Sequence, residues 1–415
     1  GDDPMTIARI QQLADDPEAL EALYRSDPTT FGRSLPQVVS AAPDSLLWRA
    51  WRARLAEDRP VERIINRTAL VATIAIALLA GLLVRLPALA LGEDWYYVRF
   101  APMIVMLALT TYFWRAHRDS RLLMGGLTLT AVAAAWVSFL PGETDSVVMA
   151  LLHLPIVFWA LLGMSYTGTG WRDSETRIDF VRYNGELVIL TALVGLGGMV
   201  FSGMTVALFQ MALGDIAEFY FENIAIVGVI AVPVVATYLY DVVFRRQTGI
   251  PPVLARVFAP LFLVMATAYL AVAFMGGKSP FSDRSFLITC NGLLLVVLGI
   301  AIFSIVERDR KAPVGLPDSI NLALVAVTLV INSIALAAIV FRLASFGFTP
   351  NRVAVLGANL VIMVHLARIG WAYLRVVRKA TDFTELRQAV SGHLPIYAAW
   401  AAIVVFVLPL VFGFA

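Results

Sequence analysis

Long runs of apolar residues, each about as long as a helix that crosses a bilayer, recur from residue 68 to residue 414. A membrane helix needs about 20 predominantly apolar residues to cross the hydrocarbon core. The runs lie at 68–91, 98–115, 121–141, 145–168, 186–212, 216–244, 252–276, 284–306, 318–343, 350–376 and 393–414. The pattern predicts an all-α fold, a polytopic transmembrane bundle of about eleven helices. The count would be ten if the two short runs within 98–141 were miscounted by one.

The connections between these runs alternate in charge. Clusters of arginine precede the first run and follow the second, fourth, sixth, eighth and tenth runs, whereas the intervening connections are short and mostly acidic. Cytoplasmic loops of membrane proteins carry an excess of Lys and Arg. We therefore expect the N-terminus to face the cytoplasm and the C-terminus to face outward, an N-in/C-out arrangement.

Residues 1–66 carry no such run and are predicted to form a small cytoplasmic helical region, in which residues 1–4 are a remnant ahead of Met5. Asp16-Pro17 and Asp27-Pro28 each place a capping residue before a proline at the first helical turn, which predicts two helix starts. The rest of the chain is divided into the first four spans, a six-helix core and the last span, at 67–168, 169–392 and 393–415.

Aromatic and basic residues alternate in Trp48-Arg49-Ala50-Trp51-Arg52, near the end of this first region. The pattern is typical of a helix that lies on the membrane surface as an anchor. A docking site for a cytoplasmic protein partner of residues 5–66 is the alternative interpretation. The connections Trp171 to Glu186 and Ala380 to His393 also predict interfacial helices, because each has an apolar face.

The composition supports an integral membrane protein and argues against several functions. The chain is 59% hydrophobic and 15% charged, and its mean hydropathy is +0.78. A net charge of +2 does not indicate a nucleic-acid partner. The single cysteine, Cys290, excludes a disulfide framework and a thiolate metal cluster. The four scattered histidines and the lack of nucleotide-binding or nucleophile motifs predict no cofactor, no metal and no catalytic residue.

Polar residues inside five different runs fall at similar depths. At 1.5 Å per residue, His153 lies roughly 12 Å, Asn223 and Asn291 roughly 10 Å, and Asn332 and Asn359 roughly 14 to 16 Å from the predicted outer end. An unsatisfied amide in hydrocarbon costs several kcal/mol, so these side chains should meet one another or water. The layer is interpreted either as interhelical hydrogen bonds or as a hydrated ligand-binding cavity.

An acidic face is predicted at the outer end of the sixth run. Asp215, Glu218 and Glu222 are three and four residues apart, so they project from one side of a helix.

Two arginines, Arg342 and Arg352, lie on the same outer side against the charge bias of the loops. Thr349 and Pro350 predict the start of a helix, with Arg352 in its first turn, where the helix dipole disfavours a cation. Either an ion pair with the acidic face or a bound anion would compensate.

These residues also carry a family resemblance. Gly347-Phe348-Thr349-Pro350-Asn351-Arg352, followed by Gly357-Ala358-Asn359, resembles the Gly-Leu-Thr-Pro-Asn-Arg segment of an uncharacterised bacterial family of multispanning membrane proteins. Arg182-Tyr183-Asn184-Gly185-Glu186 is similar to a second segment of that family, and the match covers roughly residues 170–380. Phe348 replaces the usual leucine. The resemblance implies a multi-pass protein of the bacterial inner membrane, and it supplies no catalytic residue.

The leading hypothesis is a transporter-like protein, or one that binds a small ligand or lipid, with its site in the polar layer. Expected partners are membrane lipids and an anionic small molecule or lipid headgroup. A non-catalytic partner or sensor protein is one alternative. A transferase that uses lipid-linked substrates is another, because Glu93-Asp94 place acidic groups after the first span. Such enzymes usually have a longer first outer loop and an external domain.

Overall fold

The computed structural model describes most of the chain, and the structural statements below concern these residues. They are residues 4–14, 16–26, 28–42, 45–58, 67–213, 215–244, 246, 259–264, 266–268, 270–271, 275, 284–308, 313–378 and 382–415. The chain divides into two compact units, Gly1–Arg67 and Thr68–Ala415.

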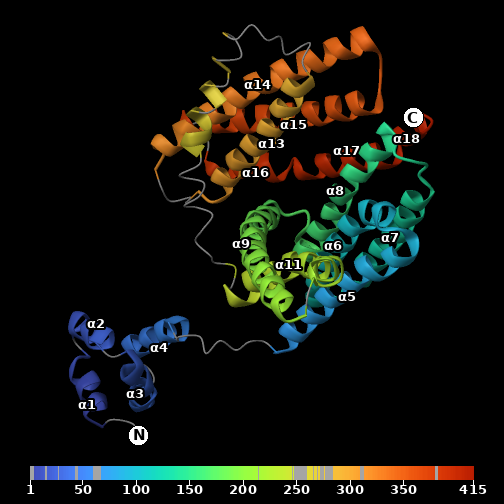
Figure 1. The fold of residues 1–415 in the computed structure, drawn as a ribbon. Helices are drawn as coiled ribbons and strands as arrows, with labels where there is room; N and C mark the ends of the chain where they lie inside the picture. Colours follow the sequence, from blue (N-terminus) through green and yellow to red (C-terminus); the bar gives the residue numbers. More distant parts are fainter. Residues whose placement is uncertain are drawn as a thin grey trace. The chain divides into compact units, whose positions relative to one another are not determined.

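The first unit contains four short helices (Figure 1). They are α1 (Pro4–Gln12), α2 (Pro17–Ser26), α3 (Pro28–Ala41) and α4 (Leu46–Asp58). Helices α2 and α3 begin at the two prolines that the sequence marks as helix starts. The Asp16 carboxylate accepts a hydrogen bond from the Ala19 backbone N–H at 3.0 Å, so it caps α2 as expected. Asp27, the other predicted cap, lies outside the described residues.

The two tryptophans of α4 belong to the core of this unit. Trp48 is 5% exposed and Trp51 is 6% exposed. They pack with apolar side chains of the other three helices: Ile10, Leu20, Phe31, Leu35, Val38 and Val39. The interpretation of the Trp/Arg segment as an exposed membrane anchor is therefore wrong for both indoles. Four helices of 9 to 14 residues offer few large apolar groups, so the tryptophans supply much of the buried surface.

The second unit is helical throughout the residues described. Its main helices are α5 (Arg67–Leu91), α6 (Glu93–His117), α7 (Ser120–Phe139), α8 (Asp145–Thr167), α9 (Ser174–Leu213), α11 (Ile226–Tyr238), α13 (Arg284–Val306), α14 (Leu316–Phe346), α15 (Pro350–Val377), α16 (Phe383–Ser391), α17 (Leu394–Phe406) and α18 (Leu408–Val411). Shorter helical turns are η1 (Gly168–Gly170), α10 (Ala217–Tyr220), η2 (Phe221–Ala225) and η3 (Leu239–Val243).

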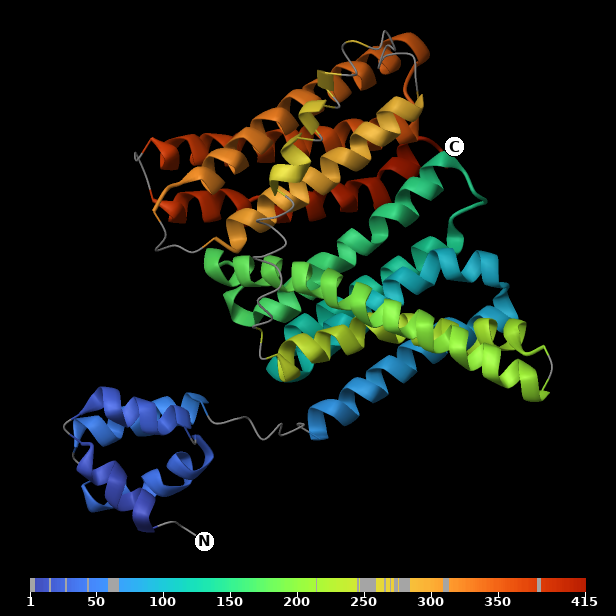
Figure 2. The same ribbon diagram turned by 60° about the vertical axis from the view of Figure 1, so that its left-hand side comes forward.

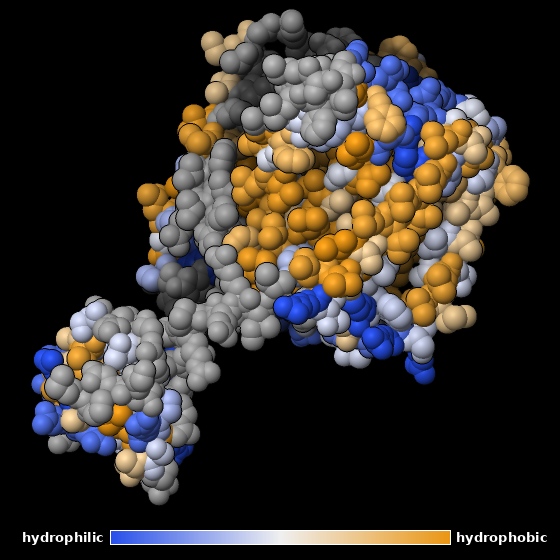
Figure 3. Space-filling view, turned by 60° about the horizontal axis from the view of Figure 1, so that its bottom comes forward, coloured by the Kyte–Doolittle hydropathy of each residue, from blue (hydrophilic) through white to orange (hydrophobic). Residues whose placement is uncertain are grey.

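Nine helices among the described residues are long and apolar enough to cross a membrane. Figure 3 shows a broad hydrophobic band on one face of this unit, with hydrophilic side chains gathered at its edges. The protein is therefore a polytopic integral membrane protein. Helices α6 and α7 are separate, with 25 and 20 residues, so the two short neighbouring runs form two helices. The predicted span 252–276 lies mostly outside the described residues, and 284–306 corresponds to α13.

Two predicted interfacial helices have the apolar faces expected of them. Ile178 and Phe180 are buried, as are Leu386 and Val390 in α16. The first of these segments, however, is not a separate helix. It continues into the fifth span as the single 40-residue helix α9, and no proline interrupts this helix.

Helix α8 lies at the centre of the arrangement that forms the candidate site. It packs against α6 on one side and α17 on the other, and it also contacts α15. Helices α13, α14, α15 and α17 run alongside one another in both ribbon views (Figures 1 and 2). Residues far apart in sequence, from Met103 to Val405, are thereby brought together around α8.

Candidate functional site

A cavity of about 610 Å³ lies where α8, α13, α15 and α17 meet, with one residue of α6 in its wall. Its lining is mostly apolar and aromatic. The lining residues are Met106, His153, Pro155, Ile156, Trp159, Asn291, Leu294, Leu295, Ala354, Val355, Ala358, Asn359, Ile362, Tyr397 and Trp400. A concave, mainly apolar site with a few polar groups is typical of small-molecule binding.

Four residues of the predicted polar layer meet at this cavity. His153, Asn291 and Asn359 line it. Asn332 is fully buried beside it and donates from Nδ2 to the backbone oxygen of Asn359 at 3.1 Å. The fifth residue, Asn223, lies elsewhere. The layer thus contains both of the arrangements that the sequence left open, interhelical hydrogen bonds and a cavity.

Asn359 occupies the polar end of this cavity. Its Nδ2 donates to the backbone oxygen of Val355 at 2.8 Å and to Oδ1 of Asn291 at 3.3 Å. Its Oδ1 is buried and has no hydrogen-bond partner among the described residues, and the same holds for Nε1 of Trp400. A buried polar atom without a partner costs about 1–3 kcal/mol. Two residues that line the cavity thus each carry a buried polar atom without a partner, one an acceptor and the other a donor.

The hydrogen bond of His153 defines the tautomer of its neutral ring. Its Nδ1 lies 2.8 Å from the backbone oxygen of Met149. A carbonyl oxygen can only accept, so Nδ1 carries the proton of the neutral ring and Nε2 keeps a lone pair. His153 is thus a further hydrogen-bond acceptor at this wall.

The aromatic side chains of the cavity are held by close packing and by one amide. The Trp400 ring lies against Gly357, where an added Cβ would be 1.9 Å from Cζ2 of the indole. Trp159 donates from Nε1 to Oδ1 of Asn184 at 2.9 Å. Gly357 and Asn184 both belong to the segments that carry the family resemblance, and each has a structural role beside this cavity.

A pair of buried histidines lies behind the cavity wall. Nδ1 of His365 is 2.8 Å from the hydroxyl of Tyr397, a lining residue, and the rings of His365 and His393 stack with centroids 4.4 Å apart. His393 donates from Nε2 to the Val361 backbone oxygen at 3.0 Å, and its Nδ1 lies 3.4 Å from Nη1 of Arg368. These contacts fix His393 as a neutral ring and tie α17 to α15.

Asn223 takes part in a second polar cluster. Its Oδ1 accepts from Nε and Nη2 of Arg85 at 3.0 and 2.9 Å. The Arg85 side chain is 7% exposed and also pairs with Glu93 and with the Tyr97 hydroxyl at 3.1 Å. Sequence reasoning missed Arg85, although a lone arginine inside an apolar run is a signal. Glu93, the acidic residue of the transferase alternative, is engaged in this ion pair.

The positive charge of Arg352 in the first turn of α15 meets backbone carbonyl groups, which neither prediction named. Thr349 caps α15 as expected, accepting from the Arg352 N–H at 3.4 Å, and Pro350 is the first helical residue. The Arg352 side chain donates to the backbone oxygens of Phe346 and Gly347 at 2.9 and 2.7 Å. These carbonyls end α14, where a helix carries partial negative charge.

Arg342 and the acidic face do not meet in the described structure. The Arg342 guanidinium lies 6.0 Å from the ring centre of Phe346, on α14. Asp215, Glu218 and Glu222 lie at the start of the sixth span, where Asp215 accepts from the Ala217 N–H at 3.1 Å. No ion pair between described residues joins this face to either arginine. The predicted pairing is therefore corrected.

The helix ends at the predicted cytoplasmic side are tied by ion pairs. Arg182 donates from Nε to Glu307 at 2.8 Å. Gly185 of the same segment lies under the Phe303 ring, where an added Cβ would be 1.5 Å from Cζ of the ring.

The Asp173 carboxylate, just before α9, accepts hydrogen bonds from the Thr176 N–H and hydroxyl. These hydrogen bonds lower the pKa of that carboxyl.

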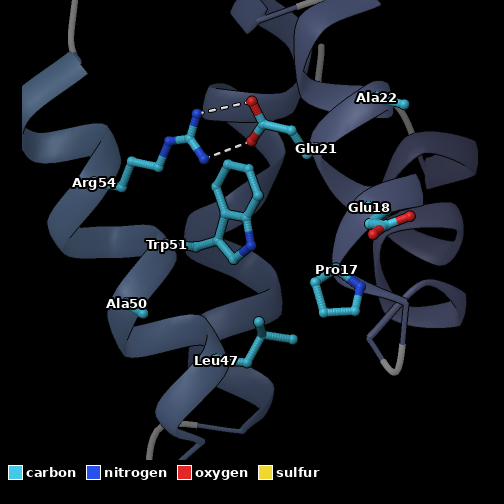
Figure 4. A pocket seen from close by; sticks show the side chains of 8 residues that line it. All are labelled: Pro17, Glu18, Glu21, Ala22, Leu47, Ala50, Trp51 and Arg54. Carbon is cyan, nitrogen blue, oxygen red and sulfur yellow. Dashed lines mark hydrogen bonds and ion pairs between the residues drawn. The ribbon is translucent and has the colours of Figure 1, made fainter.

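A shallow groove of about 700 Å³ lies between α2 and α4 of the first unit (Figure 4). Arg54 makes two hydrogen bonds to Glu21, at 2.5 and 2.9 Å, and its guanidinium lies 4.9 Å from the Trp51 ring centre. Glu18 and Leu47 line the same groove. Arg54 and Glu21 neutralise each other, and Glu18 adds one further carboxylate to the lining.

Comparisons with protein-family models, with curated proteins and with solved structures find no match for this chain. The family resemblance of the two short segments remains a prediction. The function is therefore argued from the geometry of the cavity.

Proposed function

We propose that this integral membrane protein is a transporter-like protein that binds a small amphipathic molecule, a lipid or a lipid-like ligand, in the cavity between α8, α13, α15 and α17. The observation that carries the proposal is the pair of unpartnered buried polar atoms, Asn359 Oδ1 and Trp400 Nε1, on residues of a mainly apolar wall. A ligand with one hydrogen-bond donor and one acceptor would satisfy both.

The position of the cavity favours a ligand that enters from the membrane. Leu295 and Ile156 line it and are also 61% and 37% exposed on the surface of the unit. In a membrane-spanning unit, such surface faces hydrocarbon. We therefore infer a lateral opening, through which the apolar part of a ligand would stay in contact with lipid while its polar part reaches Asn359.

A photolabelling experiment on the full chain in lipid nanodiscs tests the proposal. The probe is a monoacylglycerol with a diazirine in its acyl chain, because its hydroxyl groups both donate and accept. We expect labelled peptides from α8, α15 and α17. Trp400→Phe removes the donor and should reduce labelling up to tenfold, since one net hydrogen bond contributes about 0.5–1.5 kcal/mol. Asn359→Leu removes the acceptor and adds bulk, and should reduce it further.

The matched control is Ser333→Ala on α14, which removes an exposed hydroxyl that bonds only within its own helix. Labelling should be unchanged in this variant. Equal labelling of the wild type, Asn359→Leu and Trp400→Phe would reject the cavity as the site, provided that the variants remain folded.

A second candidate function is supported by the groove of the first unit, which would hold a peptide of a cytoplasmic partner. A photo-crosslinking amino acid at Leu47 in the full chain tests it. A crosslinked partner that is lost in a Glu18→Lys variant would support this role. A partner role would leave labelling of the membrane cavity unaffected.

A further inference from the structure

A second hollow, of about 420 Å³, lies between α6 and α8 beside the α7–α8 connection. Its lining combines two charged residues with apolar ones. The lining residues are Val98, Arg99, Pro102, Gly142, Glu143, Val147, Val148, Leu151, Leu152 and Pro155. The hollow therefore reaches from a loop, where the membrane surface would be, into the apolar part of the unit.

Arg99 is a buried cation that is held by carbonyl groups. The residue is 4% exposed and donates to the backbone oxygens of Val137, Trp95 and Gly142 at 3.2, 3.3 and 3.2 Å. Within the described residues it makes no ion pair. Three of the five N–H donors of a guanidinium are thus used, and two remain. The Trp95 ring, whose centre lies 4.9 Å from the guanidinium, stabilises part of this charge, and an anionic group would add charge-assisted hydrogen bonds to the remaining donors.

Glu143 provides the opposite charge at the same hollow. It lies in the α7–α8 connection and is exposed. A cation and an anion in one hollow of this size match a headgroup that carries both a phosphate and an ammonium group. The phosphate would meet Arg99 and the ammonium group would meet Glu143.

The two hollows share one residue and follow one side of two helices. Pro155 lines both. On α6, Arg99 and Pro102 line the second hollow and Met106 lines the first, at spacings of three and four residues. Residues at such spacings lie on one face of a helix.

On α8, the shared stripe runs from Val148 through Leu152 and Ile156 to Trp159, again at spacings of three and four. At 1.5 Å per residue this stripe is about 16 Å long. Val148, Leu152 and Ile156 are 40%, 63% and 37% exposed, so the stripe borders the lipid along much of its length. A headgroup could move along it while the acyl chains remain in hydrocarbon.

We infer that the ligand is a phosphoglyceride with a phosphate and a primary ammonium group, and that Arg99 and Glu143 bind its headgroup before it reaches the cavity. The inference rests on the proposed function, because it names the substrate of the same cavity. There, the Trp400 indole would donate to a phosphate oxygen and Asn359 Oδ1 would accept from the ammonium group. Both positions thus offer the headgroup donor and acceptor groups.

Photoactivatable phosphatidylethanolamine, with a diazirine near the headgroup, tests the order of the two positions in the full chain. Wild-type protein should be labelled near Arg99 and at the cavity. Arg99→Gln should reduce labelling at both by at least tenfold, whereas Asn359→Leu should reduce only the label at the cavity. Loss at the cavity alone in both variants would overturn the assignment of Arg99 as the first position.

Glu143→Gln provides a variant that does not threaten folding, because Glu143 is exposed. It should abolish a preference for phosphatidylethanolamine over phosphatidylglycerol, measured by competition against the photoactivatable probe. Glu218→Gln, an exposed carboxylate elsewhere, should leave that preference unchanged. Competition by inorganic phosphate as effective as that by lipid would show an anion site without lipid specificity, and would overturn the inference.

The two proposals fail in different ways. If the monoacylglycerol labels the cavity and phosphatidylethanolamine labels neither position, the inference is wrong and the proposed function stands. If neither probe labels the cavity of folded wild-type protein, both are wrong.

Discussion

Replacing Gly357 by alanine would place a methyl group where the indole of Trp400 lies. The added Cβ would be 1.9 Å from Cζ2, 2.2 Å from Cη2 and 2.4 Å from Cε2 of the ring. Three contacts below 3 Å cannot be relieved by a small rotation of the methyl group. The ring has to leave the surface of α15, and the cavity that it lines is the adjoining open space.

Two opposing contributions determine the stability of the Gly357→Ala variant. Overpacking of a tight contact costs about 1–3 kcal/mol. Alanine in place of glycine inside a helix contributes about 1 kcal/mol in the other direction. We therefore expect the free energy of unfolding to fall by no more than about 2 kcal/mol. Ligand binding should suffer more, because the displaced indole occupies part of the cavity and moves its N–H.

Thermal unfolding in detergent measures the first effect, and photolabelling of the cavity by the monoacylglycerol probe measures the second. Gly299→Ala on α13 is the matched control, since an added Cβ there has no neighbour within 4 Å. It should be neutral or slightly stabilising and should label normally. A Gly357→Ala protein with wild-type stability and wild-type labelling would refute the packing of Trp400 on Gly357 as a determinant of the cavity.

Three further predictions concern the ion pair of Arg85, the core of the first unit and the hydroxyl of Tyr397. Glu93→Gln should destabilise the protein more than Arg85→Gln, because it leaves a buried cation without its carboxylate. Equal changes in the midpoint of thermal unfolding would contradict this. Trp51→Ala should lower the free energy of unfolding of the first unit by about 3–5 kcal/mol and increase amide hydrogen exchange in that unit alone. Unchanged protection from hydrogen exchange in α1–α4 would contradict a role of Trp51 in the core. Tyr397→Phe leaves Nδ1 of His365 without its partner and should lower the free energy of unfolding by about 1–3 kcal/mol, measured by denaturant or heat; an unchanged midpoint would argue that the hydrogen bond is absent.

Features that depend on neighbouring residues in the chain could be predicted from the sequence. Apolar runs long enough to cross a bilayer indicated a polytopic helical protein, because hydrocarbon leaves a backbone few alternatives to the helix. The starts of α2 and α15, at Pro17 and Pro350, followed from a capping residue and a proline. The rise of a helix gave His153, Asn291, Asn332 and Asn359 similar predicted depths, and the structure brings them to one cavity.

Whether residues at one depth meet depends on how each helix is rotated about its axis. Asn359 reaches Asn291 and Asn332, whereas Asn223 turns to Arg85, and no pattern within a single run distinguishes these outcomes. The Arg352 side chain donates to the carbonyl groups that end α14, and Trp51 is buried in the core of the first unit. Side-chain partners of this kind are set by the packing of helices far apart in sequence, and only the tertiary structure determines them.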